Sequence, residues 1–448
     1  MRHLKLLLIL VLGLAAAPLA AQETGAAPGM EERIRQLEAQ IKAQQEALEA
    51  LKQEMEAGRE EMVTKTELAE KDTENKKMAM DVVDKALSKE MKKTNLAGVK
   101  FGGDVRLRYE GTSFDDTTID RNRFRFRLRV NVQKTIGYGL TGYFQFASGN
   151  TTLSSGADLG GEATSTNQTM GASWERKGAW IDQAYLTWTP DLPGHFFTFG
   201  GGKFKNVFVQ TAGTPLVYDT DVNPEGFYQT FTKTFGGVTP FFTMGQLFIK
   251  ENAAGPDAYM LAYQGGVTVP VGPATATVSS NYYHYIRYAT NFKYANGNTV
   301  IRPAGFNNDV LAAGKFDSLG VMAKVNAKPR GIPVEANFEY YKNLNDMNHT
   351  GVNADQDTAW QVGVLVGQNK KARDWSVYYT YRRIEADALV GAFTDSDFGH
   401  NNRKGSAVIA KYSIFENLTL GAQLFFTDPV TGTAPGFRRL LLDLEFKF

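Results

Sequence analysis

The sequence predicts an all-β transmembrane barrel of about sixteen antiparallel strands, preceded by an α-helical coiled coil. In Asn122–Val132, arginine alternates with apolar residues, so a strand there has one cationic face and one apolar face. From Val99 to Phe448, short alternating segments are separated by Gly, Pro, Asn and Asp. A barrel in lipid explains both faces of the arginine strand, because its outside meets hydrocarbon and its inside meets water. A half-exposed strand of a soluble sandwich is the alternative for that strand alone.

Composition limits the classes of protein to consider. The chain has 448 residues and a formal charge of +1, so it has no bulk attraction to nucleic acid. It contains no cysteine, which excludes disulfides, thiolate metal sites and a lipoprotein anchor. Aromatic residues make up 12% of the chain, a content that fits strands and interfacial aromatic belts.

The N-terminal segment Met1–Ala21 is typical of a secretory signal. Arg2 and Lys5 precede an apolar run, and small residues before Gln22 offer a cleavage site. A retained membrane anchor is the alternative, although the apolar run is short for a spanning helix. Residues 22–29 form a short linker in this interpretation.

Residues 30–97 are predicted to form a coiled coil and a helical linker. Between residues 30 and 62, apolar residues recur at three- and four-residue spacings, interrupted at Gln44 and Gly58. A second helix is expected around Asn75–Lys92, and a lone solvated helix is the alternative to a coiled coil. The seam positions are Ile34, Leu37, Ile41, Leu48, Leu51, Met55 and Met62.

Residues 98–448 are predicted to form the barrel. Short and long connections alternate along this region, as expected when short turns lie at one end of a barrel and long loops at the other. The predicted strands are 99–112, 121–136, 139–150, 178–190, 195–205, 226–236, 238–250, 257–270, 273–289, 315–328, 332–344, 357–369, 373–387, 403–415, 417–428 and 437–448. The long connections include 151–177, 206–225, 290–314, 345–356, 388–402 and 429–436.

The barrel lumen is the predicted site of function. Arginines on the first two strands share the inward face, and rings of Arg or Lys are how pores favour anions. Neighbouring acids, among them Asp104 and Glu110, offer the alternative that much of this charge is neutralised. The predicted pore-lining residues are Arg106, Arg108, Arg123, Arg125, Arg127 and Arg129.

The loop 206–225 is a candidate for folding inward and narrowing the pore, and an ordinary exposed loop is the alternative. Opposed acidic and basic groups there would set a transverse field. The run Asp219–Asn223 resembles the start of a calcium loop, but Pro224 replaces the required Gly, so no metal site is predicted. The candidate constriction residues are Lys203, Lys205, Asp219, Asp221 and Glu225.

No enzyme is predicted. The five histidines are scattered outside any ligand spacing, and no nucleophile or phosphate-loop motif occurs. No cofactor is expected. Two functions remain open: a water-filled diffusion channel for small hydrophilic solutes or ions with mild anion preference, and a structural anchor with a plugged barrel.

The chain resembles a known group of proteins in several segments. These are Phe101–Tyr109, the arginine strand, Asp182–Leu186, Gly202–Asn206, and Thr214–Asp219 leading into Asn223–Gly226. They are similar to the putative porins of Gram-negative outer membranes. The layout of signal, coiled coil and barrel is also similar in plan to the phosphate-selective porins. The resemblance implies a homotrimeric channel in outer-membrane lipid, with the coiled coil in the periplasm.

Overall fold

The computed structural model describes residues 30–93, 98–149, 163–345 without 172, 175, 254 and 302–309, and 355–448. The predicted signal at 1–21 and the linker at 22–29 lie outside these residues. The chain divides into two compact units, Met1–Ala97 and Gly98–Phe448. Each unit is described by itself.

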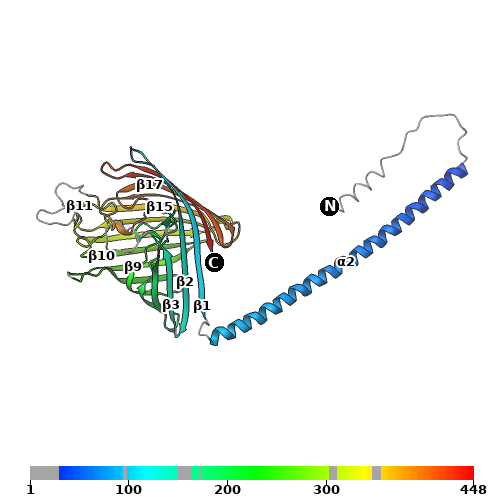
Figure 1. The fold of residues 1–448 in the computed structure, drawn as a ribbon, viewed down its shortest axis with the longest axis horizontal. Helices are drawn as coiled ribbons and strands as arrows, with labels where there is room; N and C mark the ends of the chain where they lie inside the picture. Colours follow the sequence, from blue (N-terminus) through cyan, green and yellow to red (C-terminus); the bar gives the residue numbers. More distant parts are fainter. Residues whose placement is uncertain are drawn as a thin grey trace. The chain divides into compact units, whose positions relative to one another are not determined.

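The first unit contains one continuous helix, α2 (Met30–Lys93), drawn in blue in Figure 1. The sequence predicts two helices with a weak stretch after Gly58, and the structure instead joins them. A single glycine costs about 1 kcal/mol in a helix interior. The Glu, Lys, Met and Ala residues on either side of it favour helix, so the helix continues.

Helix α2 carries an exposed apolar stripe. Ile34, Ile41, Leu48 and Met55 stand seven residues apart, and their side chains are 49–70% exposed. Positions seven apart lie on nearly the same side of a helix. A single copy of the helix therefore leaves its seam uncovered within the described part of the chain.

The second unit is a sheet whose sixteen long strands agree with the sixteen predicted ones (Figure 1). They are β1 (Val99–Phe114), β2 (Arg121–Gly137), β3 (Leu140–Ser148), β5 (Ala179–Trp188), β6 (Phe197–Lys203), β7 (Glu225–Thr232), β8 (Thr239–Lys250), β9 (Ala258–Val271), β10 (Ala274–Ile286), β13 (Phe316–Ala327), β14 (Val334–Asn343), β15 (Thr358–Gly367), β16 (Trp375–Ile384), β17 (Arg403–Phe415), β18 (Leu418–Pro429) and β19 (Phe437–Lys447). The short elements are β4 (Gln168–Thr169), β11 (Val300–Ile301), β12 (Val310–Leu311), and the 3₁₀ turns η1 (Pro329–Gly331) and η2 (Gly391–Phe393).

The sheet is closed. Each long strand pairs antiparallel with the next long strand along the chain, and β19 pairs with β1 from Phe437↔Phe114 to Lys447↔Asp104. The two-residue strand β4 pairs with β2 at Arg125 and Phe126, beyond the end of the β2–β3 ladder. Because the closed sheet has no free edge, the backbone N–H and C=O groups of every strand can be paired, as a sheet embedded in lipid requires. The predicted antiparallel barrel of about sixteen strands is therefore confirmed.

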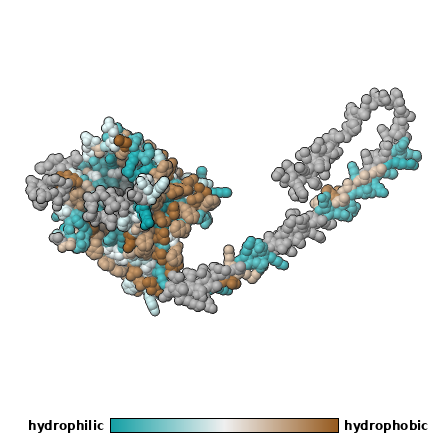
Figure 2. All heavy atoms as spheres, viewed as in Figure 1, coloured by the Kyte–Doolittle hydropathy of each residue, from teal (hydrophilic) through white to brown (hydrophobic). Residues whose placement is uncertain are grey.

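The barrel has polar groups on its inner face and apolar groups on its outer face. On β2, Phe124, Leu128 and Val130 are exposed, whereas Arg125 and Arg127 are buried. Apolar residues spread over the outer wall in the space-filling view (Figure 2). A water-soluble sheet would reverse this arrangement, so the outer wall suits contact with hydrocarbon.

Connections between the long strands alternate in length, as the sequence predicts. The turn between β2 and β3 contains only Tyr138 and Gly139, both with positive φ. A Cβ on Gly139 would lie 1.8 Å from the backbone oxygen of Thr189, so this position requires glycine. At the other end, long segments join β3 to β5, β6 to β7, β10 to β13, β14 to β15 and β16 to β17.

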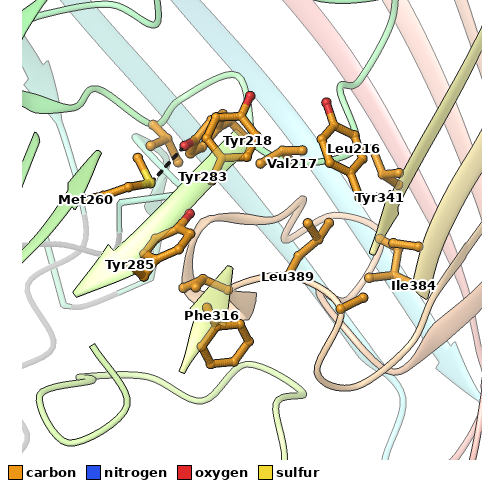
Figure 3. Packing of buried hydrophobic residues seen from close by; sticks show 14 of the residues in the cluster. Leu216, Val217, Tyr218, Met260, Tyr283, Tyr285, Phe316, Tyr341, Ile384 and Leu389 are labelled. Atoms are coloured by element: carbon orange, nitrogen blue, oxygen red, sulfur yellow. Dashed lines mark hydrogen bonds between the residues drawn. The ribbon is translucent and has the colours of Figure 1, made fainter. Parts of the chain in front are cut away.

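An apolar core lies inside the barrel. It combines inward side chains of β7–β10 and β13–β19 with residues of the segments 204–224 and 385–402. Figure 3 shows Leu216, Tyr218 and Leu389 from these segments beside Tyr283 and Tyr341 from the wall. This core fills part of the lumen.

Candidate functional site

The predicted arginines face one another across the first hairpin. In the β1–β2 register, Arg106 lies opposite Arg127 and Arg108 lies opposite Arg125. Asp104 lies opposite Arg129, so an acid stands in the same row. Because alternate residues point to one face, these charged side chains share the inner wall.

The arginines of β2 are paired with carboxylates. Arg123 and Arg125 both contact Glu110, with Arg125 Nη1 donating to Oε2 at 3.1 Å. Arg127 donates through Nε to Asp104 Oδ1 at 2.7 Å, and Arg129 donates through Nε to Oδ2 of the same residue at 2.6 Å. The row is therefore an ion-pair network rather than a bare cationic wall.

The two arginines of β1 differ in their partners. Arg108 donates to both carboxylate oxygens of Asp443 on β19, at 2.7 and 2.9 Å, and through Nη1 to Asp397 at 3.1 Å. Arg106 donates through Nη2 to the amide oxygen of Asn167 at 2.7 Å. Of the six predicted arginines, Arg106 is the one that has no carboxylate within ion-pair distance among the described residues.

The segment 204–224 lies inside the barrel. Its backbone bonds to side chains of the opposite wall: Val209 N donates to Gln264 on β9 at 2.7 Å, and Ala212 N donates to Glu335 on β14 at 2.6 Å. Phe204 and Leu216 are almost fully buried. Polar anchors and apolar burial together hold this connection across the lumen.

A second connection, 385–402, also folds inward, which sequence analysis did not predict. Leu389 and Phe398 are almost fully buried. The backbone N–H of Asp219 in the first inward segment donates to Phe393 O at 2.7 Å. The Ser396 N–H in turn donates to Asp219 Oδ2 at 3.1 Å. The two inward segments therefore form one unit within the barrel.

Arg382 on β16 connects both inward segments to the wall. Its Nη1 donates to Asp395 Oδ2 at 3.0 Å, and its Nη2 donates to Thr214 O at 3.3 Å. Its guanidinium carbon lies 4.7 Å from the ring centre of Phe398, within cation–π range. The Arg382 side chain is completely buried.

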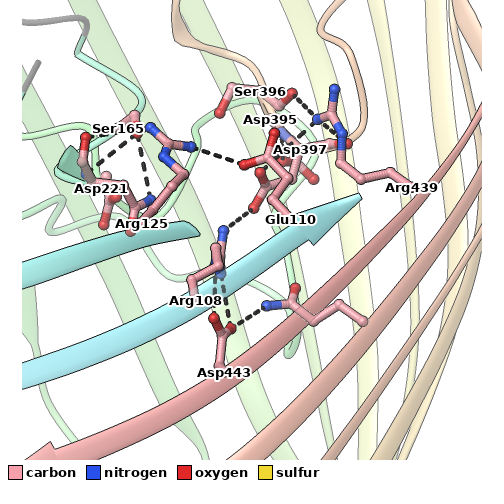
Figure 4. Close-up of polar contacts among 12 residues, drawn as sticks. Arg108, Glu110, Arg125, Ser165, Asp221, Asp395, Ser396, Asp397, Arg439 and Asp443 are labelled. Atoms are coloured by element: carbon pink, nitrogen blue, oxygen red, sulfur yellow. Dashed lines mark hydrogen bonds and ion pairs between the residues drawn. The ribbon is translucent and has the colours of Figure 1, made fainter. Parts of the chain in front are cut away.

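A cavity of about 160 Å³ lies between the charged wall and the two inward segments. Arg106, Arg108 and Lys411 contribute cations from β1 and β17. The facing carboxylates belong to the inward segments, and Figure 4 shows Asp395 and Asp397 above Arg108. Those carboxylates are Asp219, Asp221, Asp395 and Asp397. Opposite charges therefore face each other across this narrow space.

A second cavity of about 580 Å³ adjoins the first, because Ser165 and Asp221 line both. Lys203 and Glu225 line this second cavity and form an ion pair of 2.8 Å with each other. Lys205 is exposed and lines neither of the two. The structure thus brings four of the five candidate constriction residues to adjoining cavities and leaves Lys205 apart.

The loop carboxylates have unequal proton affinities. Burial, and then the nearby carboxylate of Asp395, raise the pKa of Asp219 well above its usual range. Burial likewise raises the pKa of Asp395, even though Arg382 opposes this. Burial acts on Asp397 too, but Arg108 and Arg439 hold its pKa below the usual range. Asp219 is therefore neutralised at a higher pH than an ordinary aspartate.

This difference predicts a pH dependence of ion selectivity. Acidification through the raised pKa of Asp219 removes one negative charge while the cavity cations keep theirs, so anion preference should increase. The reversal potential across a salt gradient is measured while the pH is lowered from neutral. It should shift in the direction of anion selectivity, and this shift should begin at a pH above the range in which ordinary aspartates titrate. Asp219→Asn should reduce this shift to the part that comes from Asp395, and Asp221→Asn should retain it in full. An identical response in all three proteins would contradict the assignment.

Two parts of the site had little signal in the sequence. Six apolar or small residues separate Lys411 from Arg403 and Lys404, the other cations of β17, so it belongs to no cationic row. The segment 385–402 contains Ala386, Leu389 and Phe398 in a connection between strands. That apolar content is the one signal that could have indicated burial.

Two other kinds of feature are absent from the part of the chain that the structure describes. Among the described residues, no group of three or more His, Asp or Glu side chains is arranged to hold a metal ion. Within the same residues, no helix combines the length and the hydropathy needed to cross a membrane.

Comparison with known proteins gives a family and a fold. The model of a family described as "Putative porin" matches residues 112–310 and 304–448. OprB of Pseudomonas putida is similar in structure, with 11% identity and a TM-score of 0.50, over 78% of this chain and 94% of that chain. OmpF of Salmonella typhi, solved with daunomycin, has 10% identity and a TM-score of 0.47, over 78% and 97%. No curated protein matches the chain.

Proposed function

Because the chain belongs to the putative porin family, we propose that it is an outer-membrane diffusion channel for small hydrophilic solutes or ions, with a mild preference for anions. The apolar outer wall supports a place in lipid, and the polar inner wall supports a water-filled path. The pore-lining role of the six predicted arginines is part of this proposal.

The observation that carries the proposal is the pair of adjoining polar cavities inside a closed barrel. The smaller one places Arg106 and Lys411 opposite aspartates of the inward segments, so a permeating ion would pass between opposed charges. Charge rings of this kind select by electrostatic attraction, and their effect weakens with salt as the screening length falls. A mild preference is expected, because five of the six arginines are paired with acids.

Single-channel recording on the purified full-length protein tests the proposal. We expect discrete ion-conducting steps in a planar bilayer, with a reversal potential on the anion side in a salt gradient. The anion preference should decrease between 0.01 M and 0.1 M salt, where the screening length falls from about 30 to about 10 Å. Cation selectivity at low salt would contradict the anion preference.

The alternative function, a structural anchor with a plugged barrel, rests on the apolar core inside the lumen. Leu216, Phe316 and Leu389 are almost fully buried there and fill part of the lumen. If the protein is a structural anchor with a plugged barrel, its insertion into the bilayer would give no conductance steps. The same recording therefore separates the two functions.

The exposed stripe of α2 supports self-association in the periplasm. Burying Ile34, Ile41, Leu48 and Met55 between helices would remove apolar surface from water, as in a coiled coil. We infer a homotrimer, in which barrel–barrel contacts outweigh the one helical seam.

This inference predicts that the isolated helical segment and the full-length protein self-associate to different extents. An isolated peptide of residues 30–62 should associate weakly, because its seam is short and Gln44 interrupts it. The full-length protein should be a trimer by mass measurement in detergent. A peptide with Gln44→Leu, as the matched comparison, should associate more strongly. A monomeric or dimeric full-length protein would contradict the trimer.

A further inference from the structure

The smaller cavity contains two cations that no carboxylate neutralises by direct contact. Arg106 bonds only to the amide of Asn167, and its Nε is buried without a hydrogen-bond partner in the described chain. Lys411 lines the same cavity and forms no ion pair with any residue that the structure describes, although its side chain is solvent-exposed. Solvent therefore reaches a cation on the inner wall.

The acids of this cavity already have other partners. Arg108 contacts both Asp397 and Asp443, and Arg382 contacts Asp395. Asp219 accepts from the Ser396 N–H. The remaining acid, Asp221, accepts from the N–H and hydroxyl of Thr166 at 3.2 and 3.1 Å and lies 3.8 Å from Arg129. None of these carboxylates is free to turn towards Arg106 or Lys411 without breaking a contact.

Two unneutralised cations near each other in a low-dielectric interior repel, and an anion between them removes that cost. A guanidinium offers a planar pair of donors that matches a carboxylate, whereas an ammonium acts as a point charge. The four surrounding aspartates oppose a doubly charged ligand such as phosphate. The charge pattern therefore favours a single negative charge.

The size of the cavity sets a second limit on the ligand that it can hold. Its volume of about 160 Å³ is below the ~300–1,000 Å³ that is usual for pockets holding drug-sized ligands. Ser165, Asn167 and Gln423 also line it, so polar groups surround the two cations. A ligand of a few heavy atoms with one anionic head satisfies both limits.

We propose that Arg106 and Lys411 form a binding subsite for small monocarboxylates on the permeation path. The guanidinium of Arg106 binds the carboxylate, and Lys411 supplies the second charge from the neighbouring sector of the wall. The proposal rests on the proposed channel function and names the solute class that the channel holds. Neither a metal nor another cofactor takes part.

The test measures block of chloride current by acetate and by propionate in single wild-type channels. Both carboxylates should reduce the chloride conductance in a saturable way at constant ionic strength. Arg106→Gln and Lys411→Gln should each weaken the block by about ten-fold or more, the size expected when one charge-assisted hydrogen bond is lost. Lys411→Arg keeps the charge and should keep the block.

Arg438→Gln serves as the matched control, because Arg438 is an exposed arginine of β19 outside the cavity. Acetate and propionate should block the Arg438→Gln channel as strongly as they block the wild type. Folding of each variant is checked by its heat-dependent electrophoretic mobility. Since Lys411→Gln changes an exposed side chain, it gives an answer even if Arg106→Gln fails to fold.

The outcomes separate the subsite from the channel function. Absence of conductance in the wild type would overturn the channel function itself. Conducting channels with no saturable block, or with equal block in wild type and Lys411→Gln, would overturn the subsite alone. Inorganic phosphate that blocks as strongly as propionate would overturn the assignment to monocarboxylates.

Discussion

Replacing Arg382 with Met is expected to destabilise the interior of the barrel by about 3–5 kcal/mol, the usual cost of removing one partner of a buried ion pair. The change leaves the buried Asp395 without its cation, and Thr214 O keeps only the longer hydrogen bond from Gln361 Nε2 at 3.5 Å. Because Arg382 joins both inward segments to β16, the segments should separate from the wall. Thermal unfolding in detergent should begin at a lower temperature, and channel current should become noisier.

A neighbouring arginine provides the control. Arg383 pairs with Glu385 at 3.1 Å but is one-third exposed, so Arg383→Met should cost less than about 1 kcal/mol. The double variant Arg382→Met with Asp395→Asn removes both charges and should recover much of the loss. Equal destabilisation by Arg382→Met and Arg383→Met would show that the buried pair does not hold the segments.

Replacing Leu216 with Asp should open the lumen. Leu216 is fully buried in the interior core, and losing a buried leucine side chain costs about 2–5 kcal/mol before any charge is added. An energy of this order inverts a two-state population. The strands keep their ladders, so the segment 204–224 should leave the core instead of the barrel unfolding. Single-channel conductance should rise by about two-fold or more over the wild type.

Leu216→Met is the volume-conserving control and should cost less than about 1.5 kcal/mol. Its conductance should equal that of the wild type. Should Leu216→Asp conduct like Leu216→Met while folded, the segment would not be what narrows the lumen.

The strands could be predicted well from the sequence because a lipid-facing wall imposes a strict two-residue period. In β2, each arginine from Arg123 to Arg129 is followed by an apolar residue, and the same period recurs on the outer face of β19. The predicted boundaries differ by a few residues, chiefly where a strand runs on into a connection. Predicted 273–289 ends at Ile286, because Arg287 adopts positive φ.

The charge balance of the lumen was harder to predict. The sequence shows four arginines on one strand with no acid between them, but their partners come from elsewhere in the chain. Glu110 lies across the hairpin, and Glu445 on the last strand contacts Arg127 at 2.9 Å. The hairpin register brings Glu110 beside Arg123 and Arg125, whereas only the closing β1–β19 ladder brings Glu445 beside Arg127. Local pattern identifies the inner face, whereas its net charge depends on strand neighbours hundreds of residues away.

Inward folding of loops was only partly predictable. The acids of the segment 206–225 predict a candidate constriction, whereas the sequence predicts only an ordinary long connection at 388–402. Both are held by scattered contacts, such as Gln361 Nε2 with Thr211 Oγ1 at 3.3 Å and Asn298 Nδ2 with Leu389 O at 2.7 Å. Such contacts have no sequence period, so pattern analysis cannot find them.

The closing ladder between β1 and β19 has a consequence for assembly. The partners of Arg108 and Arg127 on β19 are more than three hundred residues away in sequence. Contacts of such separation form late, because loop closure must precede them. Until the last strand pairs with β1, Arg108 lacks Asp443, Arg127 has only Asp104 of its two acids, and the edge of β1 is open. The ion pairs Arg108–Asp443 and Arg127–Glu445 therefore join the first and last strands of the sheet, and they form only after β19 has paired with β1.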